Sequence, residues 1–179
     1  AGSDTLVGGE QRNVLWSAGL PADFDRLDYS GTGGITANLS ARTVTVAGEA
    51  GVDSYSGIEQ IDGGFNQADV VTGRTTESTT VGDGAGINLF LRGGSDTVNI
   101  TPYGVQQPGS DGATVLYNWS QTAINVAFTS GNTASVSYGA SGTQLAGTDT
   151  LTNVAYIGGT AHDDSFDVRG LATNHFGFP

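Results

Sequence analysis

The sequence predicts an all-β protein made of many short strands joined by glycine turns. Val, Ile, Leu, Tyr and Phe recur in short runs, and 29 glycines but only four prolines separate these runs. Apolar residues rarely recur at helical spacing, because a glycine or a β-branched residue interrupts almost every window. The leading hypothesis is a parallel β-solenoid of the β-roll or β-helix type. A β-sandwich is the alternative, since periodicity alone does not separate the two.

The strand signals follow one another along most of the chain, each with apolar or β-branched residues in alternation. The expected strands are 26–30, 34–39, 43–47, 87–91, 97–101, 114–118, 123–129, 134–138 and 151–157. Tyr29, Tyr55, Tyr117, Tyr138 and Tyr156 fall inside these patterns or near them, and we assign them to packing rather than to ligand binding.

The charge is strongly acidic, with 6 basic and 18 acidic residues and a net charge of −12. This balance argues against nucleic acid as a partner. The acidic residues are mostly Asp, which is a good turn residue and a good ligand for hard cations. Cysteine is absent, so nothing indicates a disulfide framework or a thiolate metal site. No apolar stretch has the length of a membrane span, and we expect none.

An internal repeat organises the chain. The segment Leu27–Ser30 returns about 88 positions later as Val115–Asn118, and Gly51–Ile58 is paralleled by Gly147–Val154. Each copy then ends in a glycine pair followed by an aspartate, at Asp69 in the first copy and Asp164 in the second. We therefore expect two related β units, 1–102 and 113–179, joined by a linker at 103–112 where glycine and proline gather.

One short phrase, Gly-x-Asp-x-apolar, recurs at Gly2–Leu6, Gly51–Tyr55, Gly94–Val98 and Gly147–Leu151. Glycine permits a tight corner and leaves backbone carbonyls bare, the aspartate directs a carboxylate into that corner, and the apolar residue points into the core. Stacked corners of this kind would gather oxygen atoms around a cation. An aspartate in such a loop can equally cap its own turn without binding metal.

These phrases resemble the glycine- and aspartate-rich repeats of the RTX family, bacterial proteins usually exported by type I secretion, whose consensus is G-G-x-G-x-D-x-apolar-x. The resemblance implies calcium as the cofactor and an extracellular or cell-surface location. The candidate calcium ligands are Asp4, Asp53, Asp69, Asn88, Asp96, Asp149 and Asp164, with Asp62, Asp83 and Asp163 as secondary candidates.

Catalytic signatures are missing from the sequence. No metalloprotease, nucleophile-elbow or phosphate-loop motif occurs, and the two histidines, His162 and His175, are interpreted as ordinary loop residues. The first hypothesis is therefore a non-enzymatic structural or adhesive segment of an extracellular bacterial assembly such as a surface layer, filament or adhesin. It would form a homo-oligomer or polymer, and a cell-surface polysaccharide is a candidate adhesive partner. The alternative is a calcium-binding accessory module of a type I-secreted enzyme.

Overall fold

The computed structural model describes residues 2–8, 25–73, 87–101 and 113–170, and in these ranges the chain forms strands and no helix. The strands are β1 (Thr5–Val7), β2 (Arg26–Asp28), β3 (Ile35–Asn38), β4 (Thr43–Val46), β5 (Asp53–Ser56), β6 (Gln60–Asp62), β7 (Val70–Gly73), β8 (Ile87–Phe90), β9 (Thr97–Ile100), β10 (Ala113–Leu116), β11 (Ile124–Ser130), β12 (Thr133–Tyr138), β13 (Gly147–Thr152), β14 (Tyr156–Gly158) and β15 (Ser165–Asp167).

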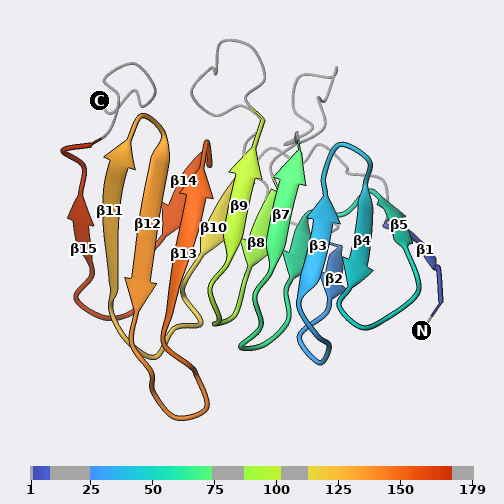
Figure 1. The fold of residues 1–179 in the computed structure, drawn as a ribbon, viewed down its shortest axis with the longest axis horizontal. Coiled ribbons are helices and arrows are strands. Elements are labelled where there is room, and N and C mark those ends of the chain that lie inside the picture. Colours follow the sequence, from blue (N-terminus) through green and yellow to red (C-terminus); the bar gives the residue numbers. More distant parts are fainter. Residues whose placement is uncertain (1, 9–24, 74–86, 102–112, 171–179) are drawn as a thin grey trace, which may run out of the picture.

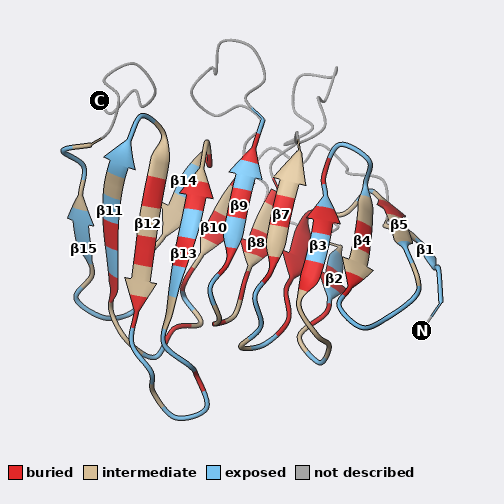
Figure 2. Cartoon of the chain, in the orientation of Figure 1, coloured by how far each residue is buried: buried red, intermediate tan, exposed pale blue. Residues whose placement is uncertain are grey.

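The strands form two stacked sheets (Figure 1). A mixed sheet of ten strands has the order β1-β5-β4-β3-β7-β9-β13-β12-β11-β15, and a parallel sheet of five strands has the order β14-β10-β8-β6-β2. In strands such as β3, β9 and β12, buried residues alternate with more exposed ones, as the banding in Figure 2 shows, so alternate residues point between the sheets. Val71, Val98 and Leu151 lie side by side on neighbouring strands of the large sheet and are fully buried. Ile61 and Leu89 face the core from the small sheet.

The parallel β-solenoid hypothesis is wrong. Strand β4 runs antiparallel to both β3 and β5, and β12 runs antiparallel to both β11 and β13. A turn with Arg42 at φ 54° reverses the chain between β3 and β4, and a turn with Gly131 at φ 57° reverses it between β11 and β12. A parallel solenoid has no such reversals, because each strand continues into the next turn in the same direction. The stacked mixed and parallel sheets are closer to the sandwich alternative.

Strand boundaries are corrected in two places. The expected strand 151–157 is two strands in different sheets, β13 and β14, because Asn153 adopts φ 56° and breaks the chain between them. Five strands lie outside the expected ranges, namely β1, β5, β6, β7 and β15, although Tyr55 of β5 was expected to pack within a strand pattern. All five are only three or four residues long and several carry Asp or Ser, so their own sequence signal is weak.

Both expected units contribute to both sheets. Strand β9 of the first unit pairs with β13 of the second in the large sheet, and β8 pairs with β10 in the small sheet. The expected linker 103–112 lies outside the described residues, as does Asp83.

Candidate functional site

Three buried aspartates lie in a row across the middle of the large sheet. Asp69 and Asp96 directly precede β7 and β9, and Asp149 lies in β13, so the three carboxylates occupy neighbouring strands. The backbone N–H of Asp69 donates to Oδ1 of Asp96 over 2.9 Å, and the N–H of Asp96 donates to Oδ1 of Asp149 over 2.9 Å. At the other end, the N–H of Ile35 donates to Oδ1 of Asp69 over 2.8 Å. Each carboxylate of this aspartate row therefore ties its strand to the next.

The aspartate row is almost completely removed from solvent, since Asp96 is 1% exposed. Burial raises the pKa of Asp69 to about 6, and burial together with the charge of Asp149 raises the pKa of Asp96 to about 9. Burial also raises the pKa of Asp149. The second oxygens of Asp69 and Asp96 are buried and accept no hydrogen bond. These oxygens are suited to carry a proton or to face a cation.

Asp149 is held differently, by two tyrosine hydroxyls. Tyr117 donates to Oδ2 over 2.7 Å and Tyr138 donates to Oδ1 over 3.1 Å. The two rings and Trp119 pack together, with centroids 5.4 to 6.0 Å apart. Both hydroxyl bonds favour the ionised form of Asp149, which explains why burial raises its pKa less than that of Asp96. Burial in turn raises the pKa of both tyrosines, so these hydroxyls stay protonated donors.

Two of the other predicted ligands, Asp53 and Asp164, accept similar hydrogen bonds outside the row. Asp53 accepts the N–H of Asp4 over 3.1 Å and the hydroxyl of Tyr29 over 3.0 Å. Asp164 accepts the N–H of Ile124 over 2.9 Å and two further bonds from Thr160.

The predicted ligands do not converge on one point. Asp4 is exposed at the β1 edge of the large sheet. Asn88 lies in the small sheet, between Gln60 and Thr114. Among the described residues, no group of three or more His, Cys, Asp or Glu side chains is placed to hold a metal ion.

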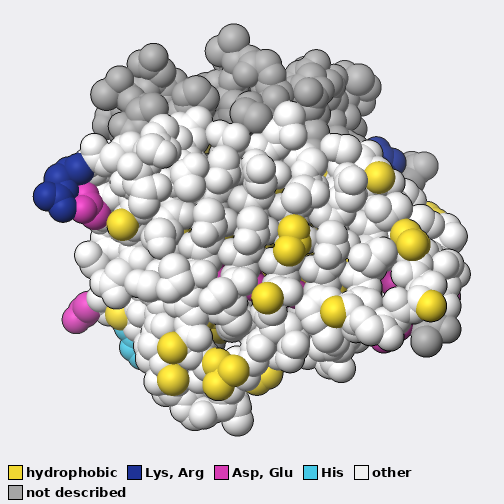
Figure 3. Space-filling view, viewed as in Figure 1, with side chains coloured by type: hydrophobic (Ala, Val, Ile, Leu, Met, Phe, Trp, Pro, Cys, Tyr) yellow, Lys and Arg dark blue, Asp and Glu magenta, His cyan; other side chains and the backbone are white. Residues whose placement is uncertain are grey.

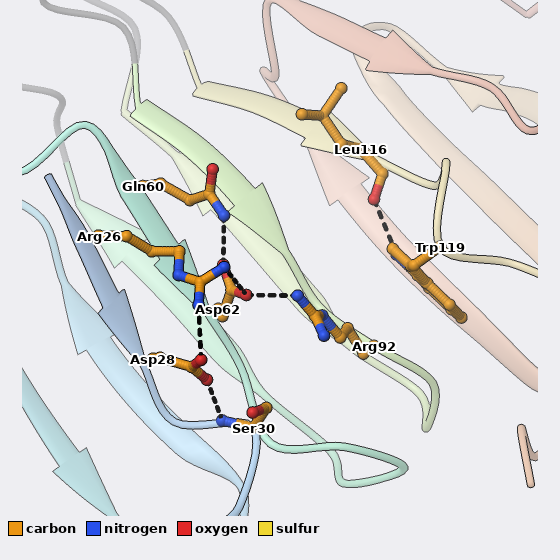
Figure 4. Close-up of polar contacts among 8 residues, drawn as sticks. All are labelled: Arg26, Asp28, Ser30, Gln60, Asp62, Arg92, Leu116 and Trp119. Carbon is orange, nitrogen blue, oxygen red and sulfur yellow. Dashed lines mark hydrogen bonds and ion pairs between the residues drawn. The ribbon is translucent and has the colours of Figure 1, made fainter. Parts of the chain in front are cut away.

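A further buried acid, Asp62, lies in an ion-pair cluster on the small sheet (Figure 4). Its Oδ2 atom is 2.6 Å from the guanidinium of Arg92 and 3.6 Å from that of Arg26, and Gln60 donates to its Oδ1. Asp28 accepts a bond from Arg26 at the edge of the same cluster. This arrangement joins β2, β6 and the segment after β8, so it holds three parallel segments together.

Sequence reasoning missed the tyrosine hydroxyls, because a tyrosine in a strand pattern is usually explained by packing alone. One signal was available: Tyr29 and Tyr117 occupy matching positions of the two repeat copies, as do their partners Asp53 and Asp149. A tyrosine hydroxyl and an aspartate at matching positions in both repeat copies indicate a hydrogen bond between them.

Comparisons with known proteins add no family to this description: no family model, no curated protein and no solved structure matches the chain. No helix within the described ranges is long and apolar enough to cross a bilayer.

Replacing Tyr117 with phenylalanine is expected to destabilise the fold by about 1–3 kcal/mol, because a buried carboxylate oxygen loses its donor. The loss should be larger at pH 8 than at pH 5, since the bond favours ionised Asp149. Urea unfolding at the two pH values measures both effects. Tyr156→Phe is the matched control, because that side chain is 63% exposed. Equal stability of the Tyr117→Phe variant and the unmodified chain would contradict the assigned bond.

Proposed function

We propose that this chain is a non-enzymatic structural segment of an extracellular bacterial protein, in which aspartates at the strand starts tie neighbouring strands together. The observation that carries the proposal is the aspartate row, in which each carboxylate accepts the backbone N–H of the adjoining strand. Acids used in this way are out of reach of a substrate, since Asp69, Asp96 and Asp149 are all buried. The resemblance of the phrases to RTX repeats supports export by type I secretion.

The outer face of the large sheet supports an adhesive version of the same role. One row of outward residues runs across eight strands and consists of Thr5, Ser54, Thr43, Asn38, Thr72, Asn99, Thr152 and Thr133. Figure 3 shows few charged side chains on this face, and those lie mainly toward its margins. A chain with a net charge of −12 thus presents a broad neutral surface of hydroxyl and amide groups. Such a surface suits a neutral cell-surface polysaccharide, which offers hydroxyls as donors and acceptors.

Calcium is a second candidate property of the same site. The buried, unpartnered oxygens of Asp69 and Asp96 favour it, because a cation between them would neutralise both charges. Calcium takes six to eight oxygen ligands, so other oxygens would have to complete the shell. Calcium binding would also fit the alternative role, an accessory module of a secreted enzyme.

Two substitutions at Asp96 test the structural role. Asp96→Asn keeps the oxygen that accepts the N–H of Asp69 and removes the charge, whereas Asp96→Ala removes the acceptor as well. We expect Asp96→Ala to lose about 1–3 kcal/mol at pH 7.5 in a chelator, and Asp96→Asn to remain at least as stable as the unmodified chain. If the alanine and asparagine variants both had the melting temperature of the unmodified chain, the proposed role of Asp96 in joining neighbouring strands would be contradicted.

The same variants test calcium. If the aspartate row binds calcium, millimolar calcium raises the melting temperature of the unmodified chain, and Asp96→Asn abolishes that increase. Identical melting curves in calcium and in chelator would exclude calcium binding by the aspartate row. The row would then bind protons instead of a cation.

A further inference from the structure

Among the described residues, β1 and β15 are the two outermost strands of the large sheet, and the apolar residue at the core position of each is incompletely buried. Phe166 of β15 is 48% exposed, although its neighbour in the register, Val126, is buried. Leu6 of β1 is only partly buried against the core, opposite buried Tyr55. The two strands lie at opposite ends of the sheet (Figure 1). An exposed apolar residue on an unpaired edge is a site for strand addition.

Strand β1 makes the same contacts to β5 that the interior strand β9 makes to β13. The N–H of Asp4 donates to Asp53 over 3.1 Å, as that of Asp96 donates to Asp149 over 2.9 Å. In the reverse direction, the carbonyl oxygens of Asp4 and Asp96 each accept an N–H from the partner strand over 2.8 Å.

The corners before these two strands also match. An added Cβ on Gly51 would lie 1.7 Å from the carbonyl oxygen of Gly2, and one on Gly147 would lie 1.7 Å from that of Gly94. Strand β1 is therefore structurally equivalent to β9.

Strand β15 is likewise equivalent to β7. Asp69, just before β7, accepts the N–H of Ile35 over 2.8 Å, and Asp164, just before β15, accepts the N–H of Ile124 over 2.9 Å. Strand β7 pairs in parallel with β3, and β15 pairs in parallel with β11. In the interior of the sheet, β7 is covered on its other side by β9, whereas β15 ends the sheet in the described residues.

We propose that β15 of one copy pairs in parallel with β1 of a second copy, as β7 pairs with β9 within the chain. The interior pairs Val70–Thr97, Val71–Val98 and Thr72–Asn99 set the register. The corresponding pairs across the joint are Ser165–Thr5, Phe166–Leu6 and Asp167–Val7. Because both halves of the joint belong to one chain and lie at opposite ends of its sheet, they meet only between copies, head to tail. The inference rests on the proposed structural role and names its partner.

The pairing of β7 with β9 within the chain also predicts the hydrogen bonds between β15 of one copy and β1 of the other. Thr97 donates its N–H to the carbonyl oxygen of Asp69 over 2.9 Å, so Thr5 would donate to Asp164 of the other copy. The joint continues the large sheet alone, because in the small sheet β8 lies between β6 and β10 and the second copy offers no described strand in its place. We therefore expect an association that depends on protein concentration.

Two variants are designed to prevent the pairing, one at the β1 edge and one at the β15 edge. Thr5→Pro removes the edge N–H of β1 and the hydroxyl bond to Ser54, but it leaves the backbone bonds to β5 at Asp4 and Gly8 on the other side of the strand. Phe166→Asp places a charge in the apolar contact of β15. Leu145→Asp is the matched control, since Leu145 is 56% exposed but lies in the loop before β13, away from both edges.

Light scattering over a range of concentrations measures the mass. The unmodified chain and Leu145→Asp are expected to grow beyond the dimer, and Thr5→Pro and Phe166→Asp are expected to stay monomeric when alone. An equimolar mixture of these two is expected to reach about twice the monomer mass and stop, since it contains one intact β15 edge and one intact β1 edge. Melting curves of each variant confirm that it is folded.

A monomeric unmodified chain at the highest concentration, or a mixture that stays monomeric while the unmodified chain assembles, overturns the head-to-tail joint. Neither result bears on the strand-tying role of the aspartates, which the Asp96 variants decide in the monomer.

Discussion

Raising the pH from 5 to 9 in a chelator is expected to destabilise the chain strongly. The folded-state pKa values of Asp69, about 6, and Asp96, about 9, lie above the value of 3.8 for an unperturbed aspartate. The folded chain therefore binds more protons than the unfolded chain, and the stability that these protons provide is complete below about pH 4 and lost as the pH rises through the folded values. Each retained proton corresponds to a slope of about 1.4 kcal/mol per pH unit.

The measurement is urea unfolding at several pH values between 5 and 9. Asp96→Asn is expected to flatten the slope above about pH 6, because it removes the aspartate with the highest pKa in the row. Asp28 and Asp164 have lowered pKa values and affect stability only at more acidic pH, outside this window. A stability that increases with pH would contradict proton binding by the aspartate row, and if it required calcium it would favour a bound cation instead.

Gly147→Ala is expected to cost about 3 kcal/mol, because its Cβ would lie 1.7 Å from the carbonyl oxygen of Gly94 and 2.5 Å from the hydroxyl of Tyr138. To relieve the clash, β13 must move away from the corner before β9. This movement would strain the bond from Asp96 to Asp149 and the bond from Thr150 to the carbonyl oxygen of Asp96. Thermal and urea unfolding of the variant measure the loss.

Substitutions at two other glycines serve as comparisons for the expected loss of stability. Gly51→Ala produces the same clash with Gly2, but β1 is a three-residue edge strand that can detach, so a smaller loss is expected. At Gly31 an added Cβ meets nothing within 4 Å, and alanine there should change stability by no more than about 0.5 kcal/mol. Losses of similar size at Gly31 and Gly147 would show that the close approach does not control stability.

The pattern of apolar residues along the chain is enough to predict short strands and the starting positions of several of them. Strands β3, β4, β9 and β12 start within one residue of their predicted positions, because alternation of apolar and polar residues specifies which side chains are buried. Alternation does not specify the direction of the neighbouring strand. Thr43–Val46 and Thr97–Ile100 have similar patterns, yet the first pairs antiparallel and the second parallel. Direction depends on the turns and on the packing of distant segments, so the two-sheet arrangement becomes visible in the three-dimensional structure and not in the local patterns.

The same limit applies to the candidate site. The sequence placed aspartates at the corners of the repeated phrase, and those corners do bring Asp96 and Asp149 together. Asp4 and Asp96 share the local sequence Gly-Ser-Asp-Thr followed by an apolar residue, yet Asp4 is exposed and Asp96 is buried with a pKa raised to about 9. The difference arises because β9 lies between two strands and β1 lies at the edge of the sheet. Burial by neighbouring strands determines the ionisation of a carboxylate, and that burial is a property of the tertiary structure rather than of the phrase.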